Sequence, residues 1–314
     1  MSKIITFSPS YTIVPTYECF NRCTYCNFRT DPHTDHWISL TQADLILQSL
    51  SDVTEILILS GEVHPKSNRR SLWFHHIYNL CDLSLKKGFY PHTNAGILTF
   101  AEMELLKNVN VSMGLMLEQI TPKLLETVHK NAPSKIPELR LQQLQWAGIL
   151  KIPFTTGLLL GIGENKSDRY DTLQAINEIH HQYKHIQEVI LQPHSKGSKE
   201  IYDNNDFHFH QLPELISKSK EILSDDITIQ IPPNLVKDKQ WLLECLNAGA
   251  RDLGGISPKD EVNPDYTHFS YAELREILLS EGWELTPRLP VYPQYYSWLN
   301  LRLRPEVQWK VSET

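Results

Sequence analysis

The sequence lacks several features that would assign it to large classes of protein. No stretch approaches about 18 consecutive apolar residues, so no membrane-spanning helix is expected. Basic residues are not in excess, because the formal net charge is −7, and this argues against a nucleic-acid-binding surface. Residues 1–7 lack a long apolar segment followed by a small-residue cleavage site, so no secretory signal is expected. These absences favour a cytoplasmic protein that acts on a small molecule.

Cysteine is also scarce, with five in 314 residues. The odd number and the clustering fit metal binding in a reducing compartment better than a disulfide framework. Cys81 and Cys245 lie in helix-like stretches and are predicted to be buried free thiols. The other three, Cys19, Cys23 and Cys26, have the spacing C-x3-C-x2-C.

That spacing indicates a particular kind of metal chemistry. Iron–sulfur cubanes are usually held by four thiolates. Three thiolates on one loop can hold three irons and leave the fourth open, and an open metal position lets a metal act on a bound molecule. The open iron could bind the amino and carboxylate groups of S-adenosylmethionine (SAM). Zinc bound with His33 or His36 as fourth ligand is an alternative, although structural zinc sites usually pair two short ligand segments and no second one is present.

Short apolar runs alternate with helical patterns along almost the whole chain. Near-continuous apolar strands separated by helices indicate a parallel sheet that is buried on both faces. Eight such units predict a closed (β/α)8 barrel, or a (β/α)6 core with an extension. We expect one domain, 1–314, with a core at about 5–235 and a completing and capping segment at about 236–314. The predicted strands lie at 11–14, 55–59, 89–93, 111–116, 153–160, 188–192, 227–231 and 251–253.

In such barrels the active site lies at the C-terminal ends of the strands. The cysteines follow the first predicted strand, so they should lie at that end. The segments that follow the other strands then supply further candidates, and glycines among them would let the backbone approach a ligand closely. The segment at 254–264, with two glycines and two prolines, is predicted to form a loop over the barrel mouth, with 287–293 packed beside it.

The motif, with Tyr25 directly before the third cysteine, resembles the radical SAM superfamily. The resemblance implies a [4Fe-4S] cluster on Cys19, Cys23 and Cys26, with SAM on the open iron. Residues 60–62 are similar to the superfamily's Gly-Gly-Glu segment, and 157–164 to its G-x-I-x-G-x-x-E segment. The candidate SAM-binding residues are Ser60, Gly61, Glu62, Thr93, Asn94, Ser112, Glu118, Gly157, Leu159, Gly161 and Gln192.

A narrower resemblance covers most of the chain. Residues 17–29, 254–258 and 287–289 resemble the CofG family, the subunits of 7,8-didemethyl-8-hydroxy-5-deazariboflavin synthase. The resemblance implies that a partner, CofH, joins a 4-hydroxybenzyl group to 5-amino-6-(D-ribitylamino)uracil. The CofG-type enzyme then closes the third ring with loss of ammonia. The candidate substrate-binding residues are His194, Ser257, Asp260, Asn263 and Arg288.

Other features of the reaction stay open. A His or a carboxylate could act as base, but no residue can be named as catalytic. One barrel fills the chain, so a CofH-like enzyme would act in trans, and a low-potential ferredoxin or flavodoxin would supply electrons. The alternatives are another radical SAM enzyme, either CofH-like or biotin-synthase-like, and a zinc-binding module without catalysis. A sulfur inserter of the biotin-synthase type would need a second cluster inside the barrel.

Overall fold

The computed structural model describes residues 3–202, 207–234, 236, 238–257, 261 and 270–304. Eight parallel strands form a closed ring, because β1 pairs with both β2 and β8. The predicted (β/α)8 barrel is therefore confirmed. The strands of the ring are β1 (Lys3–Ile13), β2 (Glu55–Leu59), β3 (Tyr90–Asn94), β4 (Ser112–Gly114), β5 (Phe154–Leu160), β6 (Ile186–Pro193), β7 (Thr228–Gln230) and β8 (Asp252–Ile256).

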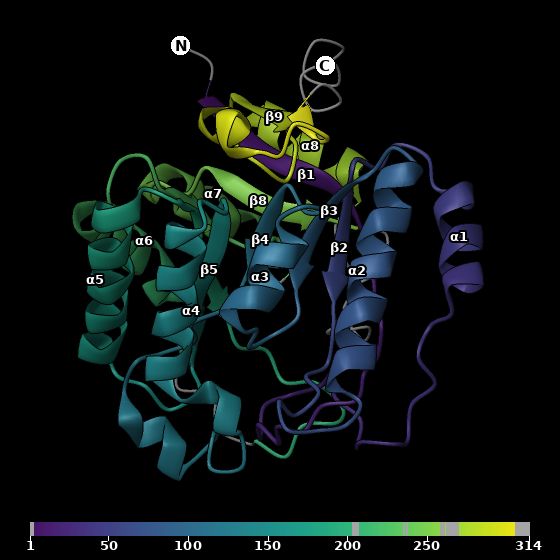
Figure 1. The fold of residues 1–314 in the computed structure, drawn as a ribbon. Helices are drawn as coiled ribbons and strands as arrows, with labels where there is room; N and C mark the ends of the chain where they lie inside the picture. The colour runs from purple at the N-terminus through teal and green to yellow at the C-terminus, as the bar shows by residue number, and fades with distance from the viewer. Residues whose placement is uncertain are drawn as a thin grey trace.

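The helices pack around the outside of the ring (Figure 1). Several begin where the sequence supplies a capping side chain: Ser39, Thr99, Asn165 and Ser270 each accept a hydrogen bond from a backbone N–H three residues later. The α-helices are α1 (Leu40–Ser49), α2 (Arg70–Lys86), α3 (Phe100–Leu106), α4 (Pro137–Ile149), α5 (Lys166–Tyr183), α6 (Leu212–Ile222), α7 (Lys239–Ala248) and α8 (Tyr271–Ser280). The 3-10 helices are η1 (Pro122–Glu126), η2 (Pro133–Lys135), η3 (Phe209–Gln211) and η4 (Pro293–Trp298). No helix in the described ranges is long and apolar enough to cross a bilayer.

The first strand is much longer than the predicted 11–14. β1 begins at Lys3, and its register with β8 shifts between Thr6 and Ser8, next to Pro9. Proline inside a sheet is found at such irregularities because it cannot donate to the ladder. The Ser-Pro-Ser sequence interrupts the apolar pattern, and for this reason the sequence predicts only the end of the strand.

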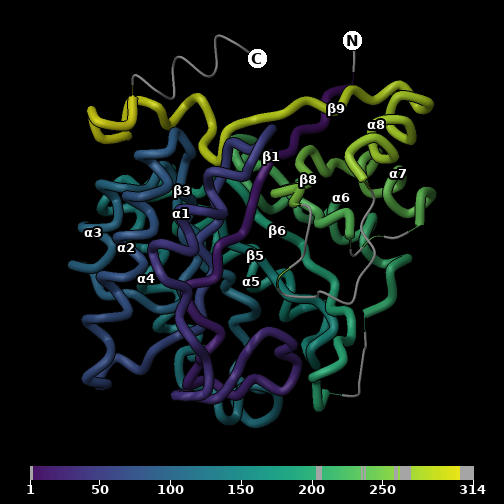
Figure 2. The backbone as a smooth tube through the Cα atoms, turned by 90° about the vertical axis from the view of Figure 1, so that its right-hand side faces the viewer, coloured from purple at the N-terminus to yellow at the C-terminus, as the bar shows by residue number. Residues whose placement is uncertain are grey.

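A ninth strand, β9 (Trp283–Pro287), was not predicted. It pairs in parallel with Lys3–Phe7, the first half of β1. Because β9 reaches only this half, the chain that follows it arrives at the N-terminal end of the barrel. Figure 2 shows this segment, in yellow, crossing the end of the molecule at which the N-terminus lies.

Hydrogen bonds fix the C-terminal segment across this end of the barrel. The Arg288 N–H donates to the Phe7 carbonyl at 2.8 Å, and Gln187 Nε2 donates to the Pro290 carbonyl at 3.1 Å. The prediction that 287–293 packs beside the loop over the barrel mouth is therefore wrong. The segment closes the opposite end, because β9 pairs with the start of β1 and not with its end.

Candidate active site

Residues 19–26, which we call the cysteine loop, follow β1 at the C-terminal end of the barrel. Backbone hydrogen bonds hold the loop against its surroundings. The Cys19 N–H donates to the Thr30 carbonyl at 3.1 Å, and the Phe20 N–H donates to the Glu62 carbonyl at 3.0 Å. Since Glu62 lies just beyond β2, the second contact fixes the loop to the neighbouring strand of the barrel.

Gly61 is required where the cysteine loop meets the end of β2. Its N–H donates to the Thr16 carbonyl at 2.8 Å. A Cβ atom at Gly61 would lie 2.1 Å from the Glu18 carbonyl oxygen, so only glycine permits this approach. Ser60, which replaces the superfamily's usual glycine, donates its hydroxyl to the Gly61 carbonyl at 2.8 Å and accepts from Trp73 Nε1 at 3.0 Å. This serine therefore links the site to α2.

The three thiols of the cysteine loop are close enough to influence one another. Burial raises the pKa of Cys23 to about 12, with smaller rises from Cys26 and Cys19, while Lys135 opposes the shift. All three side chains are partly exposed. Soft thiolate ligands suit an iron–sulfur cluster, and bound metal favours the deprotonated thiol. The donor set therefore fits a cluster with one open iron.

Neither histidine proposed for zinc lies with the thiols. His33 Nδ1 lies 3.0 Å from an Arg69 guanidinium nitrogen, and His36 lines a separate hollow beside Trp37. In the described part of the chain, no three His, Cys, Asp or Glu side chains are placed to hold a single metal ion. A cubane differs from a single ion because its thiolates bind separate irons.

A cavity of about 260 Å³, the upper cavity, opens beside the cysteine loop at the strand ends. Tyr25, Cys26 and Phe28 contribute to its wall, together with Lys135 and Arg140, which the sequence did not indicate. Several residues predicted to bind SAM come together here. They are Ser60, Glu62, Asn94, Glu118, Leu159 and Gln192.

Charged groups in the upper cavity are paired. Lys135 Nζ lies 2.5 Å from Glu118 Oε1, and an Arg140 guanidinium nitrogen lies 3.5 Å from Glu62 Oε1. Glu118 adopts a left-handed backbone conformation, with φ of 65°, which costs conformational energy for a non-glycine residue. Such strain is found at functional sites, and here it places a carboxylate in the wall of the cavity.

Two predicted SAM-binding residues face elsewhere. Thr93 points away from the barrel, because its hydroxyl donates to Asn110 Oδ1 at 2.7 Å and lies 3.3 Å from Cys81 Sγ in α2. Ser112 is fully buried near the N-terminal end, where its hydroxyl contacts His92. Neither residue lines the upper cavity. Neighbouring residues of a strand point to opposite faces, so Asn94 lines the cavity while Thr93 does not.

The other two predicted glycines, Gly157 and Gly161, act through the backbone. A Cβ atom at Gly157 would lie 2.3 Å from the Ile190 carbonyl oxygen, so this glycine lets β5 and β6 approach closely. Gly161 has φ of +90°, and its N–H donates to Glu164 Oε1 at 2.8 Å. Both shape the strand ends, and neither lines the upper cavity.

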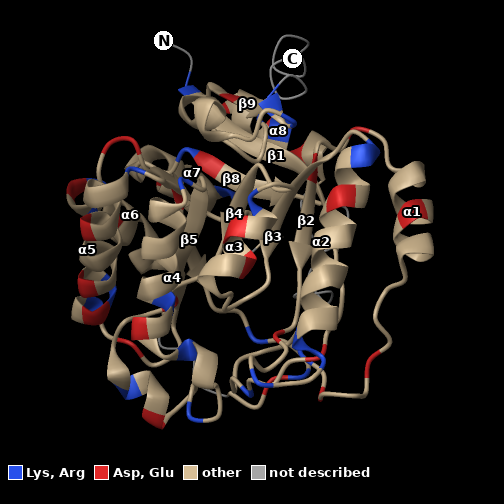
Figure 3. Ribbon diagram, in the orientation of Figure 1, with Lys and Arg blue, Asp and Glu red and all other residues tan. Residues whose placement is uncertain are grey.

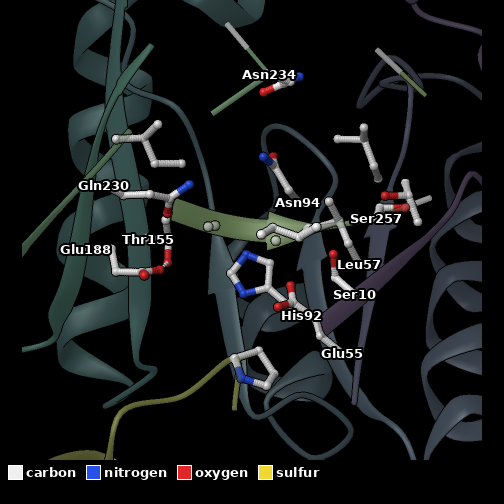
Figure 4. A pocket seen from close by; sticks show the side chains of 18 of the residues that line it. Ser10, Glu55, Leu57, His92, Asn94, Thr155, Glu188, Gln230, Asn234 and Ser257 are labelled. Atoms are coloured by element: carbon white, nitrogen blue, oxygen red, sulfur yellow. Dashed lines mark hydrogen bonds between the residues drawn. The ribbon is translucent and has the colours of Figure 1, made fainter. Parts of the chain in front are cut away.

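A second cavity of about 240 Å³, the lower cavity, lies inside the barrel (Figure 4). It shares Leu59, Asn94 and Met116 with the upper cavity, so the two adjoin. Of the predicted substrate-binding residues, Ser257 and Arg288 line the lower cavity. His194 instead lines the upper cavity, with Nε2 2.8 Å from Glu200 Oε2. The last two, Asp260 and Asn263, lie outside the described residues.

Acidic residues inside the barrel were missed by the sequence analysis. Glu55, Glu188 and Asp252 are buried near the starts of their strands, where barrels usually carry branched apolar side chains. Arg288 enters from the C-terminal segment and bonds both Asp252 and Glu188. Burial, with a smaller effect of Asp252, raises the pKa of Glu188 to about 8, while Arg288 opposes the shift. The signal in the sequence that could have revealed these residues is a single acidic residue within a strand that is otherwise apolar and buried on both faces.

Comparison with known proteins identifies the superfamily to which this barrel and cysteine loop belong. The profile of the radical SAM superfamily matches residues 13–176, a range that contains the cysteine loop and the walls of the upper cavity up to β5. The chain belongs to the radical SAM superfamily. Membership implies a [4Fe-4S] cluster and SAM as cofactors, as the motif predicts.

Similar proteins assign this chain to one family within the radical SAM superfamily. The chain is 66% identical over 307 residues to a protein of Trichormus variabilis named 7,8-didemethyl-8-hydroxy-5-deazariboflavin synthase, covering 97% of this chain and 90% of the relative. Proteins of the same name in Trichodesmium erythraeum and Synechococcus elongatus are 61% and 57% identical, over 99% and 98% of this chain and 98% and 92% of theirs. The predicted family is confirmed.

Two solved structures share the fold of this chain. The FeFe-hydrogenase maturase HydG of Carboxydothermus hydrogenoformans superposes with a TM-score of 0.75 at 16% identity, covering 97% of this chain and 70% of that one. Methylornithine synthase (PylB) gives 0.68 at 12% identity, over 90% and 84%. Cys81 and Cys245 are buried in α2 and α7, as predicted, so neither supplies a ligand for a second cluster inside the barrel.

Proposed function

We propose that this chain forms 7,8-didemethyl-8-hydroxy-5-deazariboflavin by closing the third ring of an adduct between a 4-hydroxybenzyl group and 5-amino-6-(D-ribitylamino)uracil, with loss of ammonia. The observation that carries the proposal is the pair of adjoining cavities, which share Leu59, Asn94 and Met116. One cavity lies beside the cysteine loop, and the other is a polar chamber inside the barrel. The name and the full-length identity of the relatives support the same activity.

In this proposal Cys19, Cys23 and Cys26 hold the cluster, and the upper cavity holds SAM. When bound, these groups supply a 5′-deoxyadenosyl radical that takes a hydrogen atom from the substrate. Cys26, Ser60 and Glu62 surround the place where that chemistry starts. Asn94 belongs to both cavities and would contact both molecules.

The chain's own contribution is to orient the adduct and exclude water. The C-terminal segment closes the barrel below the lower cavity, through contacts such as Gln187 to Pro290. A substrate held there is reached from the upper cavity, and a closed site prevents side reactions of reactive intermediates. The barrel and its closing segment therefore act as one catalytic unit. Ser257 and Arg288 would contact the substrate from opposite ends of the lower cavity.

Partner proteins belong to the same proposal. A CofH-like enzyme would supply the adduct in trans, and both enzymes would work in the cytoplasm. A low-potential ferredoxin or flavodoxin would dock near the cysteine loop, where Lys and Arg residues lie among the strand-end loops (Figure 3). Arg22 and Arg29, which both pair with Asp31, belong to this surface.

The decisive experiment is an anaerobic assay with the reconstituted protein, SAM, a reductant and the hydroxybenzyl adduct. We expect a fluorescent deazaflavin, with equimolar ammonia and 5′-deoxyadenosine. Deoxyadenosine without deazaflavin would leave the radical SAM chemistry in place and overturn the proposed substrate. A Cys23→Ala protein is the matched control and should form none of the three products.

A further inference from the structure

The tautomer of His92 is set by its neighbours. His92 Nδ1 lies 2.7 Å from Ser112 Oγ, and the Ser112 hydroxyl donates to the Pro290 carbonyl. A carbonyl can only accept, so the single hydroxyl hydrogen points to Pro290. Ser112 must therefore accept from His92, whose Nδ1 carries the hydrogen. The other nitrogen, Nε2, is left with a lone pair.

The lone pair of His92 is available to a molecule in the lower cavity. His92 lines the cavity from β3, and Figure 4 shows its ring among the lining side chains. Gly114, on the next strand, has no side chain to cover Nε2, since a Cβ atom there would lie 2.8 Å from it. Burial, with a smaller effect of Arg288, lowers the pKa of His92 to about 3. The imidazole therefore stays neutral, and Nε2 remains an acceptor at working pH.

Glu55 lines the same cavity from the adjacent strand. In the β2–β3 register His92 faces Leu57, two residues beyond Glu55, so both side chains lie on the inner face. Unlike Glu188 and Asp252, Glu55 forms no ion pair within the described ranges. Burial raises its pKa. A hydrogen bond from Ser8 and the charge of Arg288 oppose this rise. In its protonated form the carboxyl offers one O–H donor beside one carbonyl acceptor.

We propose that Glu55 and His92 recognise the pyrimidinedione ring of the substrate, with His92 Nε2 accepting from a ring N–H and the Glu55 carboxyl donating to the ring carbonyl beside it. The ring is a neutral cyclic ureide, whose donors and acceptors alternate as this pair of side chains requires. The other ionisable groups that line the lower cavity are Glu188, Glu261 and Arg288, and Arg288 is already paired with both Glu188 and Asp252. A neutral ring with directional hydrogen bonds therefore suits the cavity better than an anion. This inference rests on the function proposed above.

Fluorescence titration of the SAM-loaded holoenzyme tests the pair. The probes are 7,8-didemethyl-8-hydroxy-5-deazariboflavin and its N3-methyl derivative, which lacks the ring N–H. We expect the wild-type protein to bind the first about tenfold more tightly, since losing one buried hydrogen bond costs about that factor. Glu55→Gln, which keeps one donor and one acceptor, should retain this ratio. Glu55→Leu and His92→Leu should each reduce it to below about threefold.

The affinity of each variant for SAM, which we place in the upper cavity, is the control for folding. An affinity equal to that of the wild-type protein shows that the variant is folded. Equal affinity of the wild-type protein for both probes would overturn the proposal, and so would a tenfold ratio that survives both leucine substitutions. Loss of the ratio in Glu55→Gln would overturn the neutral-acid role, because it would require a carboxylate. The same probe pair without the ribityl chain should give the same ratio, and loss of the ratio there would assign the site to the hydroxyl chain. If the wild-type protein binds neither probe and forms no deazaflavin, the proposed function itself fails.

Discussion

Arg288 forms two hydrogen bonds with Asp252 inside the closed end of the barrel. Nε donates to Oδ2 at 2.6 Å and Nη2 donates to Oδ1 at 2.8 Å, and the Asp252 side chain is fully buried. Such bidentate pairs are among the stronger charge-assisted contacts. Since Arg288 also bonds Glu188, one side chain of the C-terminal segment joins β6 to β8. The fold therefore accommodates the buried acids of the barrel interior only while the C-terminal segment supplies Arg288.

Removal of the Arg288 guanidinium should destabilise the protein strongly. Arg288→Met would leave Asp252 as a buried carboxylate without a cation, beside the buried Glu188 carboxyl, at a cost of about 3–5 kcal/mol. The control is Arg302→Met, which breaks a pair with Asp82 whose arginine side chain is 50% exposed. Exposed pairs contribute about 0–1 kcal/mol. Urea unfolding of both variants measures the difference, and equal midpoints would contradict the prediction.

Replacement of one cysteine in the loop should remove the cluster. Cys23→Ala leaves two thiolates for three irons, and we expect iron content after anaerobic reconstitution to fall to background. Cys81→Ala is the matched control, because Cys81 is buried in α2 and contacts Thr93. That variant should keep about four irons per chain. Iron retained by Cys23→Ala at the wild-type level would exclude the proposed ligand set.

How far the sequence predicts this site depends on the kind of feature. The cysteine loop and the barrel follow from spacing and alternation, and both are found. Strands buried on both faces have no polar alternation, so the pattern does not reveal which residues point inward. Thr93 was assigned to the site and His92 was missed for this reason, whereas Ser112 lies too near the N-terminal end of the barrel to line the upper cavity. Arg288 reaches the closed end of the barrel because β9 pairs with β1. This contact joins residues far apart in the sequence, so the local sequence pattern does not predict it.

A methyl group at Gly61 should displace the cysteine loop. The Cβ atom would lie 2.1 Å from the backbone oxygen of Glu18, and backbone cannot yield as a side chain can. Gly61→Ala should therefore lower both iron content and SAM affinity. Gly88→Ala is the control: φ is +86° and nothing lies within 4 Å of the added Cβ, so it should cost about 1–2 kcal/mol of stability without changing iron content. Equal iron loss in both variants would count against a local effect at the loop.

Acid should destabilise the fold through buried neutral histidines, and His185 isolates this effect because it lies in neither cavity. Its ring is fully buried beside Phe154 and Tyr183. Burial lowers its pKa to about 3, against an ordinary value of 6.5. Between these values the unfolded chain binds a proton that the folded chain does not. Stability is therefore lost as pH falls through 6.5 towards 3, by about 2 kcal/mol at pH 5 for this one group.

His185→Leu should remove that part of the pH dependence. Its stability will be lower at pH 7.5 if the larger side chain packs poorly, so the informative quantity is the change in unfolding free energy between pH 7.5 and pH 5. This change should be smaller than in the wild-type protein by about 2 kcal/mol. The exposed His36 supplies the control, because His36→Leu should leave the difference between the two pH values as it is in the wild type. A His185→Leu protein that loses as much stability in acid as the wild type would show that the imidazole is protonated inside the fold, which its apolar contacts and lack of exposure oppose.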